Sequence, residues 1–176
     1  MSVENFGARV RSELTGIIYN NEMDDFSLKS SSNYFEIEPT PENRIEPGKR
    51  PQSSMGPVIG FDSRTGDVRM VLGAAGGVKI IAATAQVIMR LLYLNETIKE
   101  AIDAPRVYNQ LLPFNSTYEE GFSQDLMTDL KEIHKQPFNP KVHPFFSVVC
   151  GIYRLPNGTL TANSDFRKGG GYTAGF

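Results

Sequence analysis

The chain has little of several features that mark common classes of protein. Its one cysteine in 176 residues, Cys150, excludes an internal disulfide framework and any zinc site built from cysteines. Eighteen basic and 20 acidic residues give a net charge of -2, so no basic surface suggests nucleic acid binding. The two histidines, His134 and His143, have no second ligand at metal-binding spacing. We therefore expect no metal, no cofactor and no nucleic acid partner.

A long apolar run is also missing. The longest one, 78–94, is interrupted by Lys79, Gln86 and Arg90, so it predicts a buried helix and not a membrane span. We expect no signal peptide and no membrane anchor in the chain. A hydrophobic content of 40% is enough for one sizeable core, and the length favours a single domain over residues 1–176. Cys150 stands in an apolar run, which predicts a buried and inert thiol.

The hydrophobic pattern predicts strands, then helices, then strands. Strands are expected over 14–19, 57–61, 67–72, 145–155 and 159–165, with hairpin turns at 62–66 and 156–158. Helices are expected over 78–94, 96–103 and 118–134. The long connection from 27 to 52 is rich in Pro, Ser, Asn and Glu, and loops of this length are usually functional. This order predicts an α+β layered sandwich.

Three motifs along the chain combine into one chemistry. They are the acidic run Asn-Asn-Glu-Met-Asp-Asp-Phe at 20–26, Ser-Ser-Met at 53–55, and Gly-Ala-Ala-Gly-Gly at 73–77. Carboxylates can hold an ammonium group, and serine hydroxyls can donate to a carboxylate. Backbone N–H groups around the glycines can hold a developing oxyanion, usually the largest single contribution to acyl-transfer catalysis. Together the motifs suit an amino acid with an acyl carbon beside it.

The order and spacing of these motifs resemble the small subunit of γ-glutamyltransferase (γ-glutamyl transpeptidase), from about Phe6 to Phe176. Four further tracts agree with it: Pro-Gly-Lys at 47–49, Ala-Pro-Arg-Val at 104–107, Asn-Gln-Leu-Leu-Pro at 109–113 and Ser-Asp-Phe-Arg-Lys-Gly-Gly at 164–170. The resemblance implies part of an αββα N-terminal-nucleophile (Ntn) hydrolase sandwich, whose other half is the large subunit.

The resemblance also implies roles for single residues. Glu22 and Asp25 match positions that bind the α-ammonium group of the substrate, whereas Asp24 is expected to be structural. Ser53 and Ser54 match the pair that holds the α-carboxylate, together with an arginine of the large subunit. Gly76 and Gly77 match the two residues that form the oxyanion hole.

Each motif also has a plainer interpretation. The acidic cluster by itself reads as a solvated turn, the serines as turn hydroxyls, and the glycines as a sharp turn from strand to helix. A phosphate-binding loop is discounted, because no Lys-Ser/Thr follows the glycines. For Asp165, Arg167 and Lys168 we favour an ion pair that anchors the tail over a partner in a catalytic triad.

The start of the chain departs from the family pattern. In that family the small subunit begins with a threonine, whose hydroxyl is the nucleophile and whose own amine can act as base. Only Met1 to Asn5 precede Phe6 here, so this threonine, a second threonine and a substrate-binding asparagine have no counterpart, Val3 standing at the last position. Thr15 is the first threonine present, but it falls in an expected strand and is not assigned as nucleophile. The chain is therefore expected to lack the first strand and the nucleophile.

Two functions remain open. The first is the small subunit of a γ-glutamyltransferase/glutathione hydrolase, which binds γ-glutamyl donors such as glutathione and passes the γ-glutamyl group to amino acids, peptides or water. The second is a catalytically inactive light-chain-only paralogue or a truncated gene model that acts as an interaction subunit. Whether the chain alone is an enzyme stays open between them.

Location is predicted from three N-glycosylation sequons. They begin at Asn95, Asn115 and Asn157, and each can accept a glycan if the chain enters the secretory pathway. With the resemblance to extracellular ectoenzymes, they favour a glycoprotein of the secretory pathway or of the extracellular face of the plasma membrane.

Overall fold

The computed structural model describes residues 7–29, 32, 37–112, 114–139, 147–169 and 171–175. The chain divides into two compact units, Met1–Ser54 and Met55–Phe176, and each is described here by itself. That residues 1–176 form a single domain, as expected from the sequence, stays a prediction.

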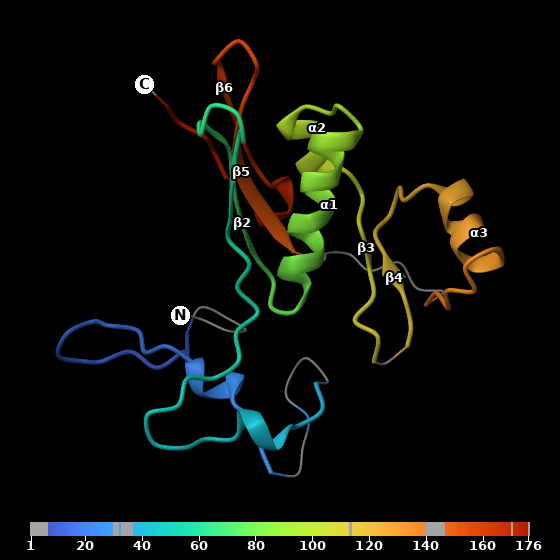
Figure 1. The fold of residues 1–176 in the computed structure, drawn as a ribbon. Coiled ribbons are helices and arrows are strands. Elements are labelled where there is room, and N and C mark those ends of the chain that lie inside the picture. The colour runs from blue at the N-terminus through green and yellow to red at the C-terminus, as the bar shows by residue number, and fades with distance from the viewer. Residues whose placement is uncertain are drawn as a thin grey trace. The chain divides into compact units, whose positions relative to one another are not determined.

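The second unit is built on a four-stranded antiparallel sheet in the order β1-β2-β5-β6 (Figure 1). Its strands are β1 (Val58–Phe61), β2 (Val68–Ala75), β5 (Val148–Arg154) and β6 (Leu160–Ser164). Both predicted hairpins are present, because β1 pairs with β2 and β5 pairs with β6. The predicted strand 145–155 begins at Val148 in the structure, and residues 140–146 lie outside the described ones.

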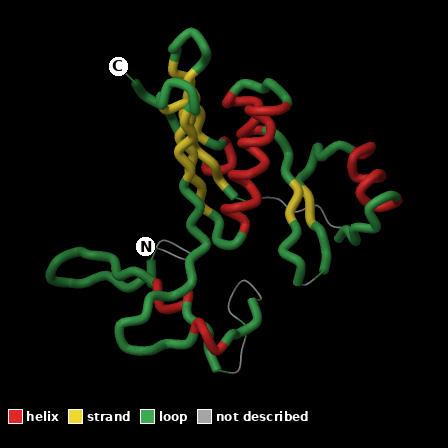
Figure 2. The backbone as a smooth tube through the Cα atoms, viewed as in Figure 1, coloured by secondary structure: helices red, strands yellow, loops and turns green. Residues whose placement is uncertain are grey.

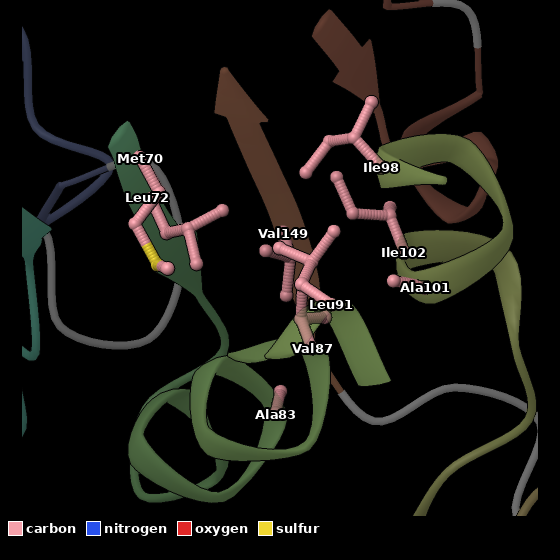
Figure 3. Packing of buried hydrophobic residues seen from close by; sticks show 9 residues of the cluster. All are labelled: Met70, Leu72, Ala83, Val87, Leu91, Ile98, Ala101, Ile102 and Val149. Atoms are coloured by element: carbon pink, nitrogen blue, oxygen red, sulfur yellow. The ribbon is translucent and has the colours of Figure 1, made fainter. Parts of the chain in front are cut away.

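Two helices, α1 (Lys79–Tyr93) and α2 (Ile98–Asp103), cover one face of this sheet (Figure 1). The core lies between the sheet and these helices. Figure 3 shows its strand residues Met70, Leu72 and Val149 together with Ala83, Val87, Leu91, Ile98, Ala101 and Ile102 of the helices. Thr97 begins α2 with a reciprocal capping box to Glu100, which satisfies two backbone N–H groups. These two helices confirm the predictions for 78–94 and 96–103. Among the described residues, none of the helices has the length and apolarity needed to span a bilayer.

The remaining elements of this unit are short. β3 (Val107–Tyr108) pairs with β4 (Thr117–Tyr118), and α3 (Gln124–Glu132) follows. The helix predicted over 118–134 is therefore too long. It begins only after Ser123, whose hydroxyl accepts a hydrogen bond from the N–H of Leu126 and so caps the first turn. A 3-10 turn, η3 (Phe166–Lys168), follows β6.

The first unit consists mostly of loops, with two 3-10 turns, η1 (Glu22–Asp25) and η2 (Pro41–Asn43) (Figure 2). The strand predicted over 14–19 is wrong. Residues 8–12 and 17–19 instead run side by side, joined by hydrogen bonds from Ala8 N to Tyr19 O and from Ser12 N to Ile17 O. Residues 13–16 form the loop between these two segments. Leu14 at this tip is 97% exposed. Local hydrogen bonding to Ser12, from the N–H groups of Thr15 and Gly16, outweighed the strand preference of the apolar residues.

Cys150 is exposed, so the expectation of a buried thiol is wrong. It lies on β5 between the core residue Val149 and Gly151, and successive side chains of a strand point to opposite faces. The thiol therefore lies on the face of the sheet that α1 and α2 do not cover.

Candidate functional site

The acidic run forms one tight turn in the first unit. Glu22, Asp24 and Asp25 all belong to η1 and are all partly buried. Within the described part of the chain, Oδ2 of Asp24 is buried without a hydrogen-bond partner. Burial, followed by the charges of Glu22 and Asp24, raises the pKa of Asp25 above its ordinary value. Carboxylates crowded and partly desolvated in this way are stabilised by a cation, such as an ammonium group.

Ser53 and Ser54 lie at the end of the same unit, where Ser53 is exposed and Ser54 is partly buried. The backbone just before them is attached to the acidic turn through one side chain. Asn43 accepts a hydrogen bond from Gln52 N at 2.8 Å and donates one to the carbonyl oxygen of Asp25 at 2.8 Å. The structure thus connects the acidic turn to the residue just before the serine pair, and the connecting residue, Asn43, was missed from the sequence.

Gly76 and Gly77 connect β2 to α1 in the second unit. Their φ angles are +140° and +59°, values that side-chain-bearing residues rarely adopt. Their carbonyl oxygens accept hydrogen bonds from Lys79 N at 3.3 Å and Ile80 N at 3.1 Å. Their own N–H groups precede the helix and so have no acceptor within it, and they stand at the positive end of its dipole. The turn that requires glycine for its shape is therefore also suited to hold an anion.

Ser147 fixes the backbone beside this turn. It is 3% exposed, and its hydroxyl donates to the carbonyl oxygen of Ala75 at 2.6 Å. A Cβ atom on Gly76 would lie 2.9 Å from both Cα and Oγ of Ser147, which is closer than real Cβ contacts allow. Ser147 in turn accepts a hydrogen bond at its carbonyl oxygen from Nη1 of Arg106 at 2.6 Å. The glycine turn is therefore packed against an anchored residue.

A buried ion network lies behind Ser147. Asp165 accepts from Nη2 of Arg106 at 2.8 Å and from Nη1 of Arg167 at 3.0 Å, and Arg167 also pairs with Glu119. Burial alone would raise the pKa of Asp165, but hydrogen bonds from Val149 N and from Arg106 outweigh it, so this pKa lies below its ordinary value. The ion pair expected at the tail is thus present between Asp165 and Arg167, whereas the parts played by Arg106 and Glu119 were not foreseen.

The other candidate residues lie apart from these motifs in sequence. Asn95 and Asn157 are exposed, whereas Asn115 is partly buried and precedes the buried Ser116. All three sequons stay predictions of glycosylation. His134 is exposed, and His143 and Val3 lie outside the described residues.

Comparisons with known proteins identify the class to which this arrangement belongs. Residues 1–175 match the Gamma-glutamyltranspeptidase family. The structure is similar to that of an acivicin-inhibited gamma-glutamyltranspeptidase, with a TM-score of 0.84 and 33% identity over 94% of this chain and 88% of that one. Such structures are Ntn hydrolases, so the predicted mixed α+β fold of an Ntn hydrolase is confirmed.

Two similar curated proteins come from Scolopendra dehaani. Scoloptoxin SSD20 and Scoloptoxin SSD14 are each 47% identical over 94% of this chain, which spans 82% of SSD20 and 28% of SSD14. Glutathione hydrolase proenzyme 2 of Schizosaccharomyces pombe is 38% identical over 78% of this chain, covering 22% of its own length. The chain belongs to the γ-glutamyltranspeptidase/glutathione hydrolase family, and it spans about a quarter of the length of two of these three relatives.

Proposed function

We propose that this chain binds the γ-glutamyl donor and stabilises the oxyanion in a γ-glutamyltransferase/glutathione hydrolase. One observation carries the proposal most directly. Three partly buried carboxylates share a single turn, and the backbone before Ser53 is attached to that turn through Asn43. A receptor for an amino acid needs such an arrangement, because the ammonium and carboxylate groups of the ligand leave the same carbon atom.

The donor is held by charge-assisted hydrogen bonds in this proposal. Glu22 and Asp25 accept from the α-ammonium group, and each such bond contributes roughly 1.5–3 kcal/mol. Ser53 and Ser54 donate to the α-carboxylate. Glutathione fits this description, since its γ-glutamyl residue carries a free α-ammonium and α-carboxylate.

The chemical step is acyl transfer. The nucleophile in this proposal is an N-terminal threonine supplied by a segment other than the described residues, and its hydroxyl proton passes to its own amine during attack. The carbonyl electrons move to the γ-oxygen, where the N–H groups of Gly76 and Gly77 hold the negative charge. Collapse breaks the amide bond, the departing amine takes up the proton, and water or an acceptor amine then releases the acyl group.

A large-subunit partner is part of the proposal. Ile59, Val71 and Ile152 lie opposite one another on three adjacent strands, on the sheet face away from the core, and are 59%, 42% and 45% exposed. An apolar row of this kind suits a second sheet packed face to face. We assign this face to the large subunit.

Location is part of the proposal as well. We propose that the chain enters the secretory pathway and carries glycans at Asn95, Asn115 and Asn157.

The test uses the assembled protein, meaning the protein that contains this chain together with any partner subunit it carries. Asp25→Ala should raise the KM for γ-glutamyl-p-nitroanilide, because it removes one charged acceptor for the ammonium group. Asp129→Ala, which removes an exposed carboxylate on α3, is the matched control and should leave this KM unchanged.

An unchanged KM in Asp25→Ala would refute the assignment. A raised KM in Asp24→Ala with none in Asp25→Ala would transfer the ammonium contact to the neighbouring residue. Donor binding without any release of p-nitroaniline is the result expected of a catalytically inactive paralogue.

A further inference from the structure

One side chain joins the two halves of the proposed donor site, and we propose that Asn43 is a positioning residue for donor binding. Its role would be to set the separation between the acidic turn and the serine pair. This inference rests on the proposed function, because it acts through the residues assigned there to the ammonium and carboxylate groups.

The contacts of Asn43 use both ends of its amide. Nδ2 donates to the carbonyl oxygen of Asp25 at 2.8 Å and to Oγ of Ser27 at 3.3 Å, while Oδ1 accepts from Gln52 N at 2.8 Å. The backbone of Asn43 takes part as well, since its carbonyl oxygen accepts from Ser27 N at 2.9 Å. Residues separated by 27 positions in the chain, Asp25 and Gln52, are thereby attached to one residue.

Apolar packing contributes little to that separation in the described part of this unit. Phe26 is the one buried apolar side chain among its described residues, and the described structure there contains no strand. Asn43 stands at the end of η2, whose last turn is closed by a hydrogen bond from Arg44 N to Pro41 O. Hydrogen bonds, those of the Asn43 side chain among them, therefore take the place of apolar packing in holding the acidic turn near the backbone before the serine pair.

The chemistry requires asparagine in particular. Asparagine offers a donor and an acceptor on a short, planar group, whereas an ionised aspartate can only accept. Asn43→Asp keeps the size and the contact to Gln52 N but loses the donation to the Asp25 carbonyl. It also places a charge close to a turn that already holds three carboxylates.

The first experiment compares Asn43→Ala and Asn43→Asp with wild type in the assembled protein. Both variants should raise the donor KM by about tenfold, the effect of losing one well-formed hydrogen bond, and should change kcat by far less. The matched control is Asn109→Ala in the second unit. Asn109 makes a similar pair of contacts, donating to Oγ of Ser116 at 3.0 Å and accepting from Leu111 N at 2.8 Å, and its loss should leave the donor KM unchanged.

A mutant cycle separates positioning from general destabilisation. If Asn43 acts by positioning the acidic turn, Asn43→Ala should raise the donor KM by less than about threefold in a Glu22→Ala/Asp25→Ala background, which lacks both proposed ammonium acceptors, because the coupled effects are not additive. Full additivity, or a kcat loss as large as the KM change, would overturn the positioning role. The proposed function fails separately, if Asp25→Ala alone leaves the donor KM unchanged. Asp25→Ala with a raised KM and both Asn43 variants with a normal one would refute only this inference.

Discussion

Alanine at Gly76 tests the oxyanion assignment, because this residue meets two constraints at once. Its φ of +140° is a conformation that L side chains rarely adopt, and an added Cβ would lie 2.9 Å from the Cα of Ser147. Ser147 cannot move aside easily, since it is hydrogen-bonded to Ala75 and to Arg106. The turn itself must therefore shift, and the N–H groups of Gly76 and Gly77 shift with it.

The size of the effect follows from the loss of one oxyanion donor. Such a loss reduces kcat by about 10²–10³, or about 2.7–4 kcal/mol of transition-state stabilisation. We expect Gly76→Ala to lower kcat by about 100-fold or more, with little change in the donor KM, because the ammonium and carboxylate contacts are assigned to other residues.

Steady-state release of p-nitroaniline from γ-glutamyl-p-nitroanilide by the assembled protein measures both constants. Gly158→Ala provides the control, since Gly158 has φ of +88° in the β5–β6 turn and no atom within 4 Å of its added Cβ. It carries similar backbone strain without the contact, so it should lose stability but keep kcat. A folded Gly76→Ala protein with kcat within about threefold of wild type would refute the reasoning, since even one lost donor predicts far more.

Three further predictions concern charge and packing. Because the pKa of Asp25 is raised, its carboxylate is protonated at a higher pH than an ordinary aspartate, so the donor KM should rise as pH falls through that pKa. Asp25→Asn should remove this step from the KM profile, and a step that persists would assign it to another group. Asp165→Asn leaves the buried Arg106 facing a neutral amide and should lower the free energy of unfolding in urea by about 3–5 kcal/mol. Lys99→Gln, at the more exposed pair with Asp103, should change the free energy of unfolding by less than about 1 kcal/mol. Equal losses of unfolding free energy in the two variants would contradict a special role for the buried pair. Ile152→Lys places a charge in the exposed apolar row and should reduce copurification of the proposed large subunit while leaving the thermal unfolding of this chain unchanged. Undiminished copurification would exclude that face as the proposed interface.

Local patterns were enough to predict the elements around the core. The helix over 79–93 and the two hairpins are encoded by spacing of apolar residues and by turn residues within a few positions. Cys150 was misjudged because an apolar run does not reveal on which face of the sheet a side chain lies, and this one lies on the face that α1 and α2 do not cover. The strand expected over 14–19 failed because short-range hydrogen bonding to Ser12 forms a turn there.

Long-range hydrogen bonds left no signal in the sequence. Asn43 reaches Asp25 across 18 positions, and Arg106 reaches the carbonyl of Ser147 across 41. Neither contact produces a period or a composition that marks the residue. The acidic run, the serine pair and the glycine turn could be picked out because their residue types are unusual together, whereas the residues that hold them in place became visible only in the structure.

The two sets of proposed site residues are held by different forces, and this bears on what each variant should do. Gly76 and Gly77 follow a central strand and precede a helix whose residues Ala83, Val87 and Leu91 form part of the core, so their backbone is as stable as the second unit. The acidic turn and the serine pair depend instead on hydrogen bonds in a unit with one buried apolar side chain, Phe26, among its described residues. Segments of this kind open locally at much lower free energy than a core does. Loss of Asn43 should therefore act on donor binding before it acts on global unfolding, whereas loss of Asp165 should act on global unfolding first.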